Sequence, residues 1–375
     1  MKSDVLVIGG GLAGCTTALM LAMEGVGVVV VDEGVLIGRA SSANAGSIHL
    51  QIPFPEYMSL GHEWATRYAK VLPMMQASVA LWRELESVIG AAAALRLEGG
   101  LLVATTQDQM AAIARKVALE NSIGLEITVI DRATLRAIAP YLAPNIIGGA
   151  WCPDEGKANP LTAGPALVAA ARARGVRFFE DTPVTRLERE RSHWRATTPT
   201  GEFVAGRIIN AAGAAAARVA AMAGVPIAVE GFPIQASVTE AATPFVPHLV
   251  YSAADKLTLK QTAGGHFIIG GGWPSQQSTS GALSVDPASV AANMMIAAQT
   301  VPAIGRLRVA RTWPAIVNGT ADWMPLIGEA PGSPGFYLAL FPWMGFTGAP
   351  ITARIVADLI VGREAPVDPA LLLAA

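Results

Sequence analysis

A glycine-rich turn between a strand and a helix constrains the fold of this chain more than any other feature. Val5–Ile8 is a continuous apolar run, as expected of a buried parallel strand, and a helix is predicted from about residue 12 to 24. A second apolar run over 28–31 ends at Asp32. The turn between the first strand and the helix contains Gly9, Gly11 and Gly14. This βαβ unit predicts a dinucleotide site, in which backbone amides meet the pyrophosphate and the acid accepts from ribose hydroxyls.

Composition narrows the class of protein. The 375 residues include 27 Lys+Arg and 29 Asp+Glu without a basic run, which argues against nucleic acid as a partner. Hydrophobic residues make up 52% and charged residues only 15%, so the chain either buries an unusually large fraction or presents an apolar surface to a partner. Two cysteines, Cys15 and Cys152, are too few for a disulfide framework, an iron–sulfur cluster or a zinc site, and no metal is expected.

Two uncharged stretches are long enough to raise the question of a membrane span. The first, over 5–23, contains the glycine cluster of the turn and is better explained as strand and helix of the βαβ unit. The second, over 330–353, contains four prolines that would interrupt a helix in lipid. We therefore expect no span and no cleaved signal.

Later segments extend the pattern of strands and helices. A long helix is predicted over 63–89, and strands with loops dominate from about 227 to 309. The chain closes with a strand over 335–340, a glycine-containing turn and a helix with one apolar face. The alternation predicts an α/β protein with two interleaved domains.

Four segments, in this order along the chain, carry a resemblance to a known family. They are Ser42–Gly46, Ile208–Gly213, Trp313–Gly328 and Gly345–Pro350. At these residues the chain resembles the flavin amine oxidase family that includes D-amino-acid dehydrogenase, glycine oxidase and sarcosine oxidase. The closing segments look most like the β subunits of heteromeric opine and D-hydroxyproline dehydrogenases.

The resemblance implies a fold and a division of the chain. It implies a glutathione-reductase-like Rossmann domain that binds FAD, formed by residues 1–85, 145–225 and 310–375. Residues 86–144 and 226–309 would form an interleaved α+β substrate domain, whose mixed or antiparallel sheet covers the isoalloxazine.

The resemblance also implies cofactor contacts, residue by residue. The glycines of the first turn would hold the pyrophosphate, Asp32 the ribose, and Val184 the adenine. The start of the last helix would stabilise negative charge on the reduced flavin. The implied cofactor residues are Gly9, Gly11, Gly14, Asp32, Ser42, Asn44, Ala45, Gly46, Val184, Ala212, Gly213, Gly345, Phe346, Thr347 and Gly348.

The chain departs from the family pattern at two places. Relatives with covalent flavin use a cysteine late in the chain, and neither Cys15 nor Cys152 lies there, so FAD is expected to be non-covalent. Many small-amino-acid oxidases carry an arginine that clamps the substrate carboxylate where this chain has Val317. Glycine and simple D-amino acids are therefore doubtful substrates.

Several polar and aromatic residues are candidates for the substrate site. Those expected to act in catalysis are His49, Lys260 and Trp343, and those expected to contact the substrate are Tyr251, Gln261, Arg311 and Trp273. Relatives carry a cationic residue near Lys260.

The favoured function is FAD-dependent oxidation of a secondary amine or imino acid, opine-like or D-hydroxyproline-like, by hydride transfer to flavin N5. We expect a catalytic subunit of a heteromeric dehydrogenase whose partner subunits carry further electron carriers. A single-chain, peroxide-producing oxidase of the glycine or sarcosine type remains an alternative, as does a flavoprotein subunit with a structural or electron-relay role. The expected location is the cytoplasm, with or without attachment to a membrane through partners.

Overall fold

A computed structural model describes residues 1–367 and contains two eight-stranded sheets. The first sheet is formed by β1 (Lys2–Ile8), β2 (Val28–Val31), β8 (Arg177–Phe179), β9 (Arg186–Glu190), β10 (His193–Thr198), β11 (Gly201–Asn210), β19 (Leu326–Glu329) and β20 (Phe336–Leu340). The second sheet is formed by β4 (Gly100–Ala104), β5 (Thr128–Asp131), β6 (Gly148–Cys152), β12 (Glu230–Ala241), β13 (Leu249–Ser252), β14 (Thr258–Gln261), β15 (His266–Gly270) and β18 (Val309–Gly319). Two small ribbons pair β3 (Ser47–Ile48) with β7 (Gly156–Lys157), and β16 (Gln276–Gln277) with β17 (Leu283–Ser284).

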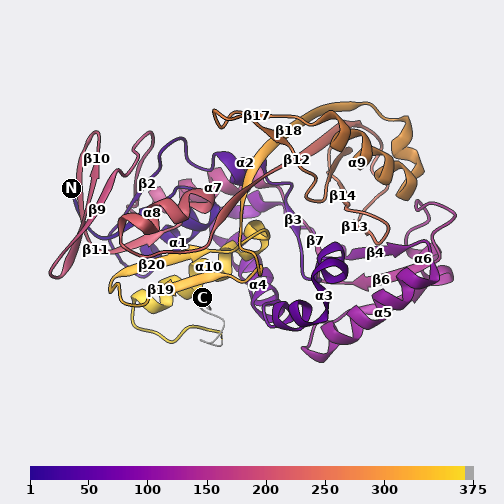
Figure 1. Ribbon diagram of the computed structural model, residues 1–375, viewed down its shortest axis with the longest axis horizontal. Coiled ribbons are helices and arrows are strands. Elements are labelled where there is room, and N and C mark those ends of the chain that lie inside the picture. Colours follow the sequence, from indigo (N-terminus) through magenta and orange to yellow (C-terminus); the bar gives the residue numbers. More distant parts are fainter. Residues whose placement is uncertain (368–375) are drawn as a thin grey trace.

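Helices cover both sheets. They are α1 (Leu12–Met23), α2 (Arg39–Ala43), α3 (Phe54–Ala69), α4 (Leu72–Ile89), α5 (Gln107–Ser122), α6 (Arg132–Ile138), α7 (Pro160–Arg172), α8 (Ala216–Met222), α9 (Pro287–Thr300) and α10 (Gly345–Ile360), with 3-10 turns η1 (Gly90–Ala93), η2 (Gly213–Ala215) and η3 (Pro302–Arg306). The hairpin of β9 and β10 lies at one end of the molecule, and α5 and α6 lie at the other (Figure 1). None of the helices within residues 1–367 is long and apolar enough to cross a membrane.

The first sheet has a parallel centre. Its order is β19-β20-β11-β1-β2-β8, and β9 and β10 extend β11. Val5 of β1 pairs with Val28 of β2 on one side and with Arg207 of β11 on the other, all in parallel. The carboxyl ends of these strands meet at one edge, where ligands bind in α/β sheets.

The second sheet is mixed, in the order β18-β12-β15-β14-β13-β4-β6-β5. β13 runs parallel to β4, whereas the other neighbours are antiparallel. These two sheets confirm the predicted fold class. β6 and β18 belong to this sheet although both lie in segments predicted for the FAD-binding domain, and the division into domains stays a prediction.

The turn after β1 requires glycine at two positions. Gly9 has a φ of +109°, and a Cβ there would lie 2.4 Å from the carbonyl oxygen of Ala211. A Cβ on Gly14 would lie 2.0 Å from the carbonyl oxygen of Gly9. The end of β11, the turn and the first turn of α1 therefore meet backbone to backbone.

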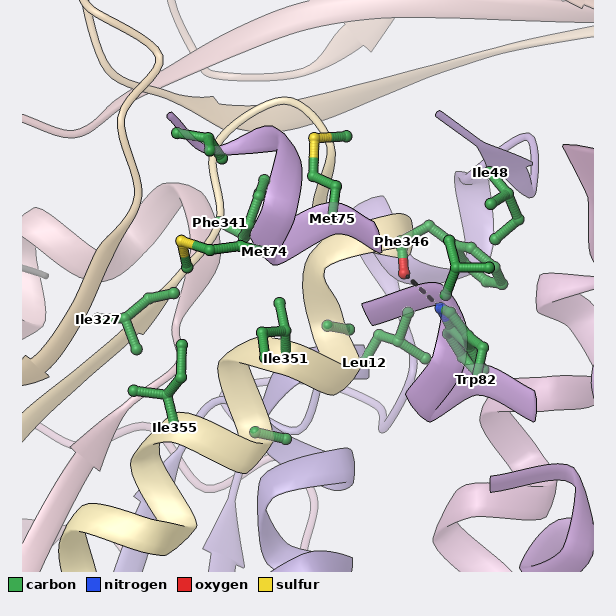
Figure 2. Packing of buried hydrophobic residues seen from close by; sticks show 14 of the residues in the cluster. Leu12, Ile48, Met74, Met75, Trp82, Ile327, Phe341, Phe346, Ile351 and Ile355 are labelled. Atoms are coloured by element: carbon green, nitrogen blue, oxygen red, sulfur yellow. Dashed lines mark hydrogen bonds between the residues drawn. The ribbon is translucent and has the colours of Figure 1, made fainter. Parts of the chain in front are cut away.

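The final helix is anchored in the main core (Figure 2). The rings of Phe346 and Trp82 stack with centroids 4.9 Å apart, and Trp82 Nε1 donates to the carbonyl oxygen of Phe346 at 3.1 Å. Ile351 and Ile355, on the predicted apolar face, are fully buried. The first turn of α10 is thus held firmly against α4.

The long helix predicted over 63–89 is wrong as a single element. α3 is interrupted at Gly61, whose φ of +83° is not helical, and its second part begins close to the predicted start at 63. α3 ends at Ala69, and α4 begins at Leu72. Pro73 explains the break, because proline lacks the N–H that a helix interior requires and is tolerated in a first turn. The apolar periodicity continues across the break and conceals it.

The contact at Gly14 predicts a strong effect of a single methyl group. Gly14→Ala should lower the free energy of unfolding of the apoprotein by about 1–3 kcal/mol or more, because the methyl group meets backbone that cannot move aside. Gly305→Ala is the matched control, since its Cβ would lie 3.5 Å from Ala298 Cβ, an ordinary contact. Equal urea midpoints for the two variants would contradict this packing argument.

Candidate functional site

A cavity of about 660 Å³ lies along the carboxyl edge of the parallel sheet. Its walls include the turn glycines Gly9 and Gly11, residues 211–213 after β11, and residues 345–346 at the start of α10. Residues 314–318 of β18 contribute the wall on the side of the second sheet. Volume and position are typical of a small-molecule site, for which roughly 300–1,000 Å³ is usual.

The predicted cofactor residues divide into those that line this cavity and those behind its wall. The lining residues are Gly9, Gly11, Asp32, Asn44, Val184, Ala212, Gly213, Gly345 and Phe346. Gly14, Ser42, Ala45, Gly46, Thr347 and Gly348 are not among the lining residues. Gly46 and Gly348 have packing roles: a Cβ on Gly46 would lie 2.2 Å from the carbonyl oxygen of Ala158, and one on Gly348 would lie 2.3 Å from the ring of Phe341.

Asp32 orients the turn and borders the cavity. One carboxylate oxygen accepts from the amide of Gly10 at 2.7 Å, and the other accepts from the amide of Gly34 at 2.8 Å. A carboxylate offers about four lone-pair sites, so acceptor capacity remains for a ribose hydroxyl. Asp32 therefore fits the predicted role.

The geometry of the cavity fits a dinucleotide. A Cβ on Gly11 would meet only Ser41 Oγ, at 3.1 Å, and a Cβ on Gly345 or Gly213 would have nothing within 4 Å. Gly11 and Gly345 stand at the N-terminal ends of α1 and α10, whose first amides have no acceptor within their own helix. Such helix ends bind phosphate oxygens and other negative charge.

Some lining residues escaped prediction. Ser41, rather than its neighbour Ser42, borders the cavity and accepts from the amide of Leu12 at 2.9 Å. Arg39 and Arg218 also line it, and both pair with Glu33, at 2.8 and 2.5 Å. Because Ser41 and Ser42 are adjacent and identical, only the course of α2 distinguishes them.

The two cysteines are enclosed. Cys15 is fully buried and its thiol donates to the carbonyl oxygen of Gly10 at 3.3 Å. Cys152 is buried as well, and burial raises the pKa of both thiols. Neither thiol is among the cavity-lining groups, in keeping with the prediction of non-covalent FAD.

Three predicted substrate-site residues come together beside the start of α10. Nδ1 of His49 lies 2.7 Å from the hydroxyl of Tyr251. Lys260 is buried and donates to Ser47 Oγ at 2.6 Å. The backbone of this segment contacts Thr347, whose hydroxyl accepts from the amide of His49 and donates to the carbonyl oxygen of Ser47.

Trp343 lies elsewhere, in the wall of the cavity. Its ring stacks on Trp323 with centroids 4.8 Å apart and packs against Phe232 at 4.5 Å. Its φ is +60°, uncommon for a bulky residue, and its buried Nε1 has no hydrogen-bond partner within residues 1–367. This N–H is enclosed by its neighbours, so Trp343 presents its ring and not its donor to the cavity.

The remaining candidates do not reach this region. The side-chain amide of Gln261 forms hydrogen bonds with nearby backbone. Its oxygen accepts from the amides of Phe245 and Val246, and its nitrogen donates to the carbonyl oxygen of Gly265. Arg311 is exposed on β18, and Trp273 donates to the carbonyl oxygen of Lys256. None of the three lines the cavity, and neither do His49, Tyr251 and Lys260; among the predicted catalytic and substrate residues, Trp343 alone lines it.

A buried polar network that the sequence did not reveal stands behind His49 and Tyr251. Tyr251 donates to Glu155 Oε1 at 3.1 Å, and Gln51 Nε2 donates to Glu155 Oε2 at 2.7 Å. Lys116 contacts both Gln51 Oε1, at 3.2 Å, and Glu120, at 2.6 Å. The one signal in the sequence is the i, i+4 spacing of Lys116 and Glu120. Such ion pairs usually lie on an exposed helix face, so the spacing does not predict a buried network.

Burial shifts the protonation of these groups. Burial, and then the charge of Lys260, lower the pKa of His49 to about 3, so this imidazole is neutral at physiological pH. Burial, and then the charge of Lys157, lower the pKa of Lys260 to about 7. Burial raises the pKa of Tyr251 and that of Glu155.

Comparison with known proteins agrees with the geometry. The family described as FAD dependent oxidoreductase matches residues 4–359. Glycine oxidase from Geobacillus kaustophilus is 27% identical, over 98% of this chain and 95% of that protein. One of the subunits of opine oxidase from Rhizobium meliloti is 28% identical, over 96% of this chain and 94% of that protein. The crystal structure of L-proline dehydrogenase from P. horikoshii superposes with a TM-score of 0.83 at 26% identity, over 98% of this chain and 96% of that one.

The open space at Gly11 predicts a clean loss of cofactor. The wild-type protein should purify yellow and release its FAD on acid denaturation. Gly11→Val should purify colourless but folded, because its φ of −76° suits any residue while the side chain fills the cavity. Visible absorbance and thermal melting measure the two properties. Gly264→Val, in a loop of the second sheet, is the control and should keep its FAD.

The depressed pKa of Lys260 predicts a dependence of stability on pH. Between pH 7 and 10.5 the unfolded chain binds a proton at this lysine that the folded chain does not, so the free energy of unfolding of the apoprotein rises with pH in this window. Compared with Lys260→Met, the wild type should gain up to about 1.4 kcal/mol per pH unit. Parallel stability curves for the two proteins between pH 7 and 10 would show that Lys260 is not desolvated.

Proposed function

Because the chain belongs to the family of FAD-dependent oxidoreductases, we propose that it oxidises the C–N bond of a secondary amine or imino acid, opine-like or D-hydroxyproline-like. The relatives named above act, by their names, on amino acids and opines. Bound FAD supplies a two-electron acceptor for the α-hydrogen of the substrate, which leaves as hydride and yields an imine that water hydrolyses.

The observation that carries the proposal is the wall formed by β18. Its residues 314–317 are Pro, Ala, Ile and Val, so an apolar surface stands where many small-amino-acid oxidases place an arginine. Among the described lining residues, the positively charged side chains are those of Arg39 and Arg218, and both already pair with Glu33. An apolar substituent on the substrate suits this wall better than a lone carboxylate.

Residues of this chain would position the substrate and the cofactor. The glycines of the first turn and Asp32 would hold the dinucleotide, and the start of α10 would face the flavin. Trp343 presents its ring at the cavity wall. Lys260 is a buried cation whose charge is present below about pH 7, and it donates to Ser47 Oγ beside the start of α10 without lining the cavity.

A single-chain oxidase of the glycine oxidase type is the second candidate. It is favoured by the 27% identity with glycine oxidase over nearly the full length of both chains. A structural or electron-relay subunit is the third, and substrate-dependent flavin reduction by the purified chain would argue against it.

The valine at position 317 leads to a prediction of specificity. With dye as acceptor, the wild type should oxidise larger N-substituted amino acids with a kcat/KM well above that for glycine. Val317→Arg should raise kcat/KM for glycine by about tenfold to a hundredfold, because a charge-assisted hydrogen bond is worth about 1.5–3 kcal/mol. Val317→Met controls for size and should leave glycine a poor substrate. Wild-type turnover of glycine equal to that of the larger amines would contradict the proposal.

We also propose that the chain works as a catalytic subunit with partners that carry further electron carriers. Its low content of charge and its similarity to a protein named as a subunit support this. Produced alone, the chain should reduce oxygen slowly, whereas co-production with subunits encoded beside it should give one complex with dye-reducing activity. Size-exclusion chromatography measures the assembly of the complex, and peroxide assays measure the reduction of oxygen. A stable single chain that makes peroxide rapidly would contradict this role.

A further inference from the structure

The backbone amide and Nδ1 of His49 both have hydrogen-bond partners, whereas its second ring nitrogen, Nε2, has none within residues 1–367. Its backbone amide donates to Thr347 Oγ1 at 3.0 Å, which ties it to the first turn of α10. Its Nδ1 lies 2.7 Å from the hydroxyl of Tyr251. Within residues 1–367 no hydrogen-bond partner is present at Nε2, and the side chain is only half-buried. The direction of the bond at Nδ1 decides whether Nε2 is a donor or an acceptor.

That direction depends on Glu155, because the hydroxyl of Tyr251 has a single proton to donate. Glu155 receives the amides of Leu50 and Gln51 on Oε1, at 2.7 and 2.9 Å, and the side-chain amide of Gln51 on Oε2, at 2.7 Å. These groups can only donate. Tyr251 is a fourth donor, at 3.1 Å, and it shares Oε1 with the two backbone amides, so this oxygen is an acceptor toward the tyrosine.

The residues around Glu155 provide space for its carboxylate and connect it to a buried lysine. A Cβ on Gly100 would lie 1.8 Å from Glu155 Oε2, so the neighbouring strand provides the space by having glycine there. Gln51 also connects Glu155 to Lys116, and the charge of Lys116 opposes the effect of burial on the pKa of Glu155. Two buried carboxylates of this region, Glu120 and Glu155, are accompanied by two buried lysines, Lys116 and Lys260.

We propose that Glu155 is a positioning residue that fixes His49 as the Nδ1-protonated tautomer and leaves Nε2 as an acceptor for an N–H of the amine. Tyr251 donates to Glu155, and its oxygen then accepts from Nδ1–H of His49. A neutral secondary amine has one N–H, which matches one imidazole acceptor. The tautomer stands on the geometry of this chain alone, whereas the role toward the amine rests on the proposed function.

Removing the acceptor opposite Tyr251 defines the test. Glu155→Met leaves no oxygen there, so the tyrosine should donate to Nδ1 and His49 should change to the Nε2-protonated tautomer. Glu155→Gln is the matched control, because its amide oxygen can take the place of Oε1 beside the two backbone amides and still accept from Tyr251, so the tautomer should not change. Tyr251→Phe removes the bridge but keeps the ring, so His49 should show a mixture of tautomers. Thermal melting and FAD content identify any variant that fails to fold, and Tyr251→Phe decides the matter if Glu155→Met does not fold.

The tautomers are read by NMR of the holoprotein labelled with ¹⁵N-histidine. The chain has five histidines, and loss of a signal in His49→Asn assigns the relevant one. His248 is an internal control, because its Nδ1 lies 2.6 Å from the hydroxyl of Tyr141 without Glu155 behind it, and its signals should not change in Glu155→Met. An Nε2-protonated His49 in the wild type, or an unchanged tautomer in Glu155→Met, would overturn the proposal.

Kinetics test the role toward the amine separately. Glu155→Met should lower kcat/KM for the best secondary amine by about tenfold or more at unchanged FAD content, because the acceptor for its N–H is lost. If the tautomer changes and kcat/KM does not, the amine contact is overturned while the Glu155–Tyr251–His49 relation stands. The proposed function itself fails on another result, namely the absence of any amine that the wild type oxidises.

Discussion

The close approach of Gly14 to the carbonyl oxygen of Gly9 sets the position of α1 on the parallel sheet. A Cβ on Gly14 would lie only 2.0 Å from the carbonyl oxygen of Gly9, so the helix and the turn are in contact through their backbones, with no side chain between them. This contact directs the N-terminal end of α1 toward the cavity, beside Gly11 and Asp32. The other walls follow from it, because α10 packs on α1 and brings residues 345–346 to the opposite side of the same space.

The second sheet adds what the dinucleotide fold lacks. β18 contributes an apolar wall, and β13 and β14 bring Tyr251 and Lys260 to the short β3–β7 ribbon that carries Ser47 and precedes His49. Charged groups are buried here at high density, which is costly unless every donor has an acceptor. The chain of contacts from Lys116 through Gln51 to Glu155 offsets part of this cost and ends at a neutral imidazole, whereas Glu120 Oε2 has no partner within residues 1–367.

Local patterns made the dinucleotide turn, the family and FAD predictable, and these predictions are confirmed by the family match. The residues of the turn lie within 24 positions of Asp32 and depend only on local geometry. Glu155 could not be found in this way, because it reaches Leu50 and Gln51 over about a hundred residues of sequence. Gln261 shows the opposite case. Its segment predicts a contact with the substrate, but its side-chain amide forms hydrogen bonds with the backbone of Phe245 and Gly265 instead. Neither the sequence nor the family match identifies the substrate or the partners.

The measurement that tests the central claim most directly is the visible spectrum of the holoprotein mixed with an N-substituted amino acid in the absence of oxygen. The account predicts that the flavin bleaches in a single turnover, with one equivalent of the carbonyl product of imine hydrolysis released per FAD. A flavin that stays oxidised with every secondary amine, imino acid and amino acid tested would contradict it.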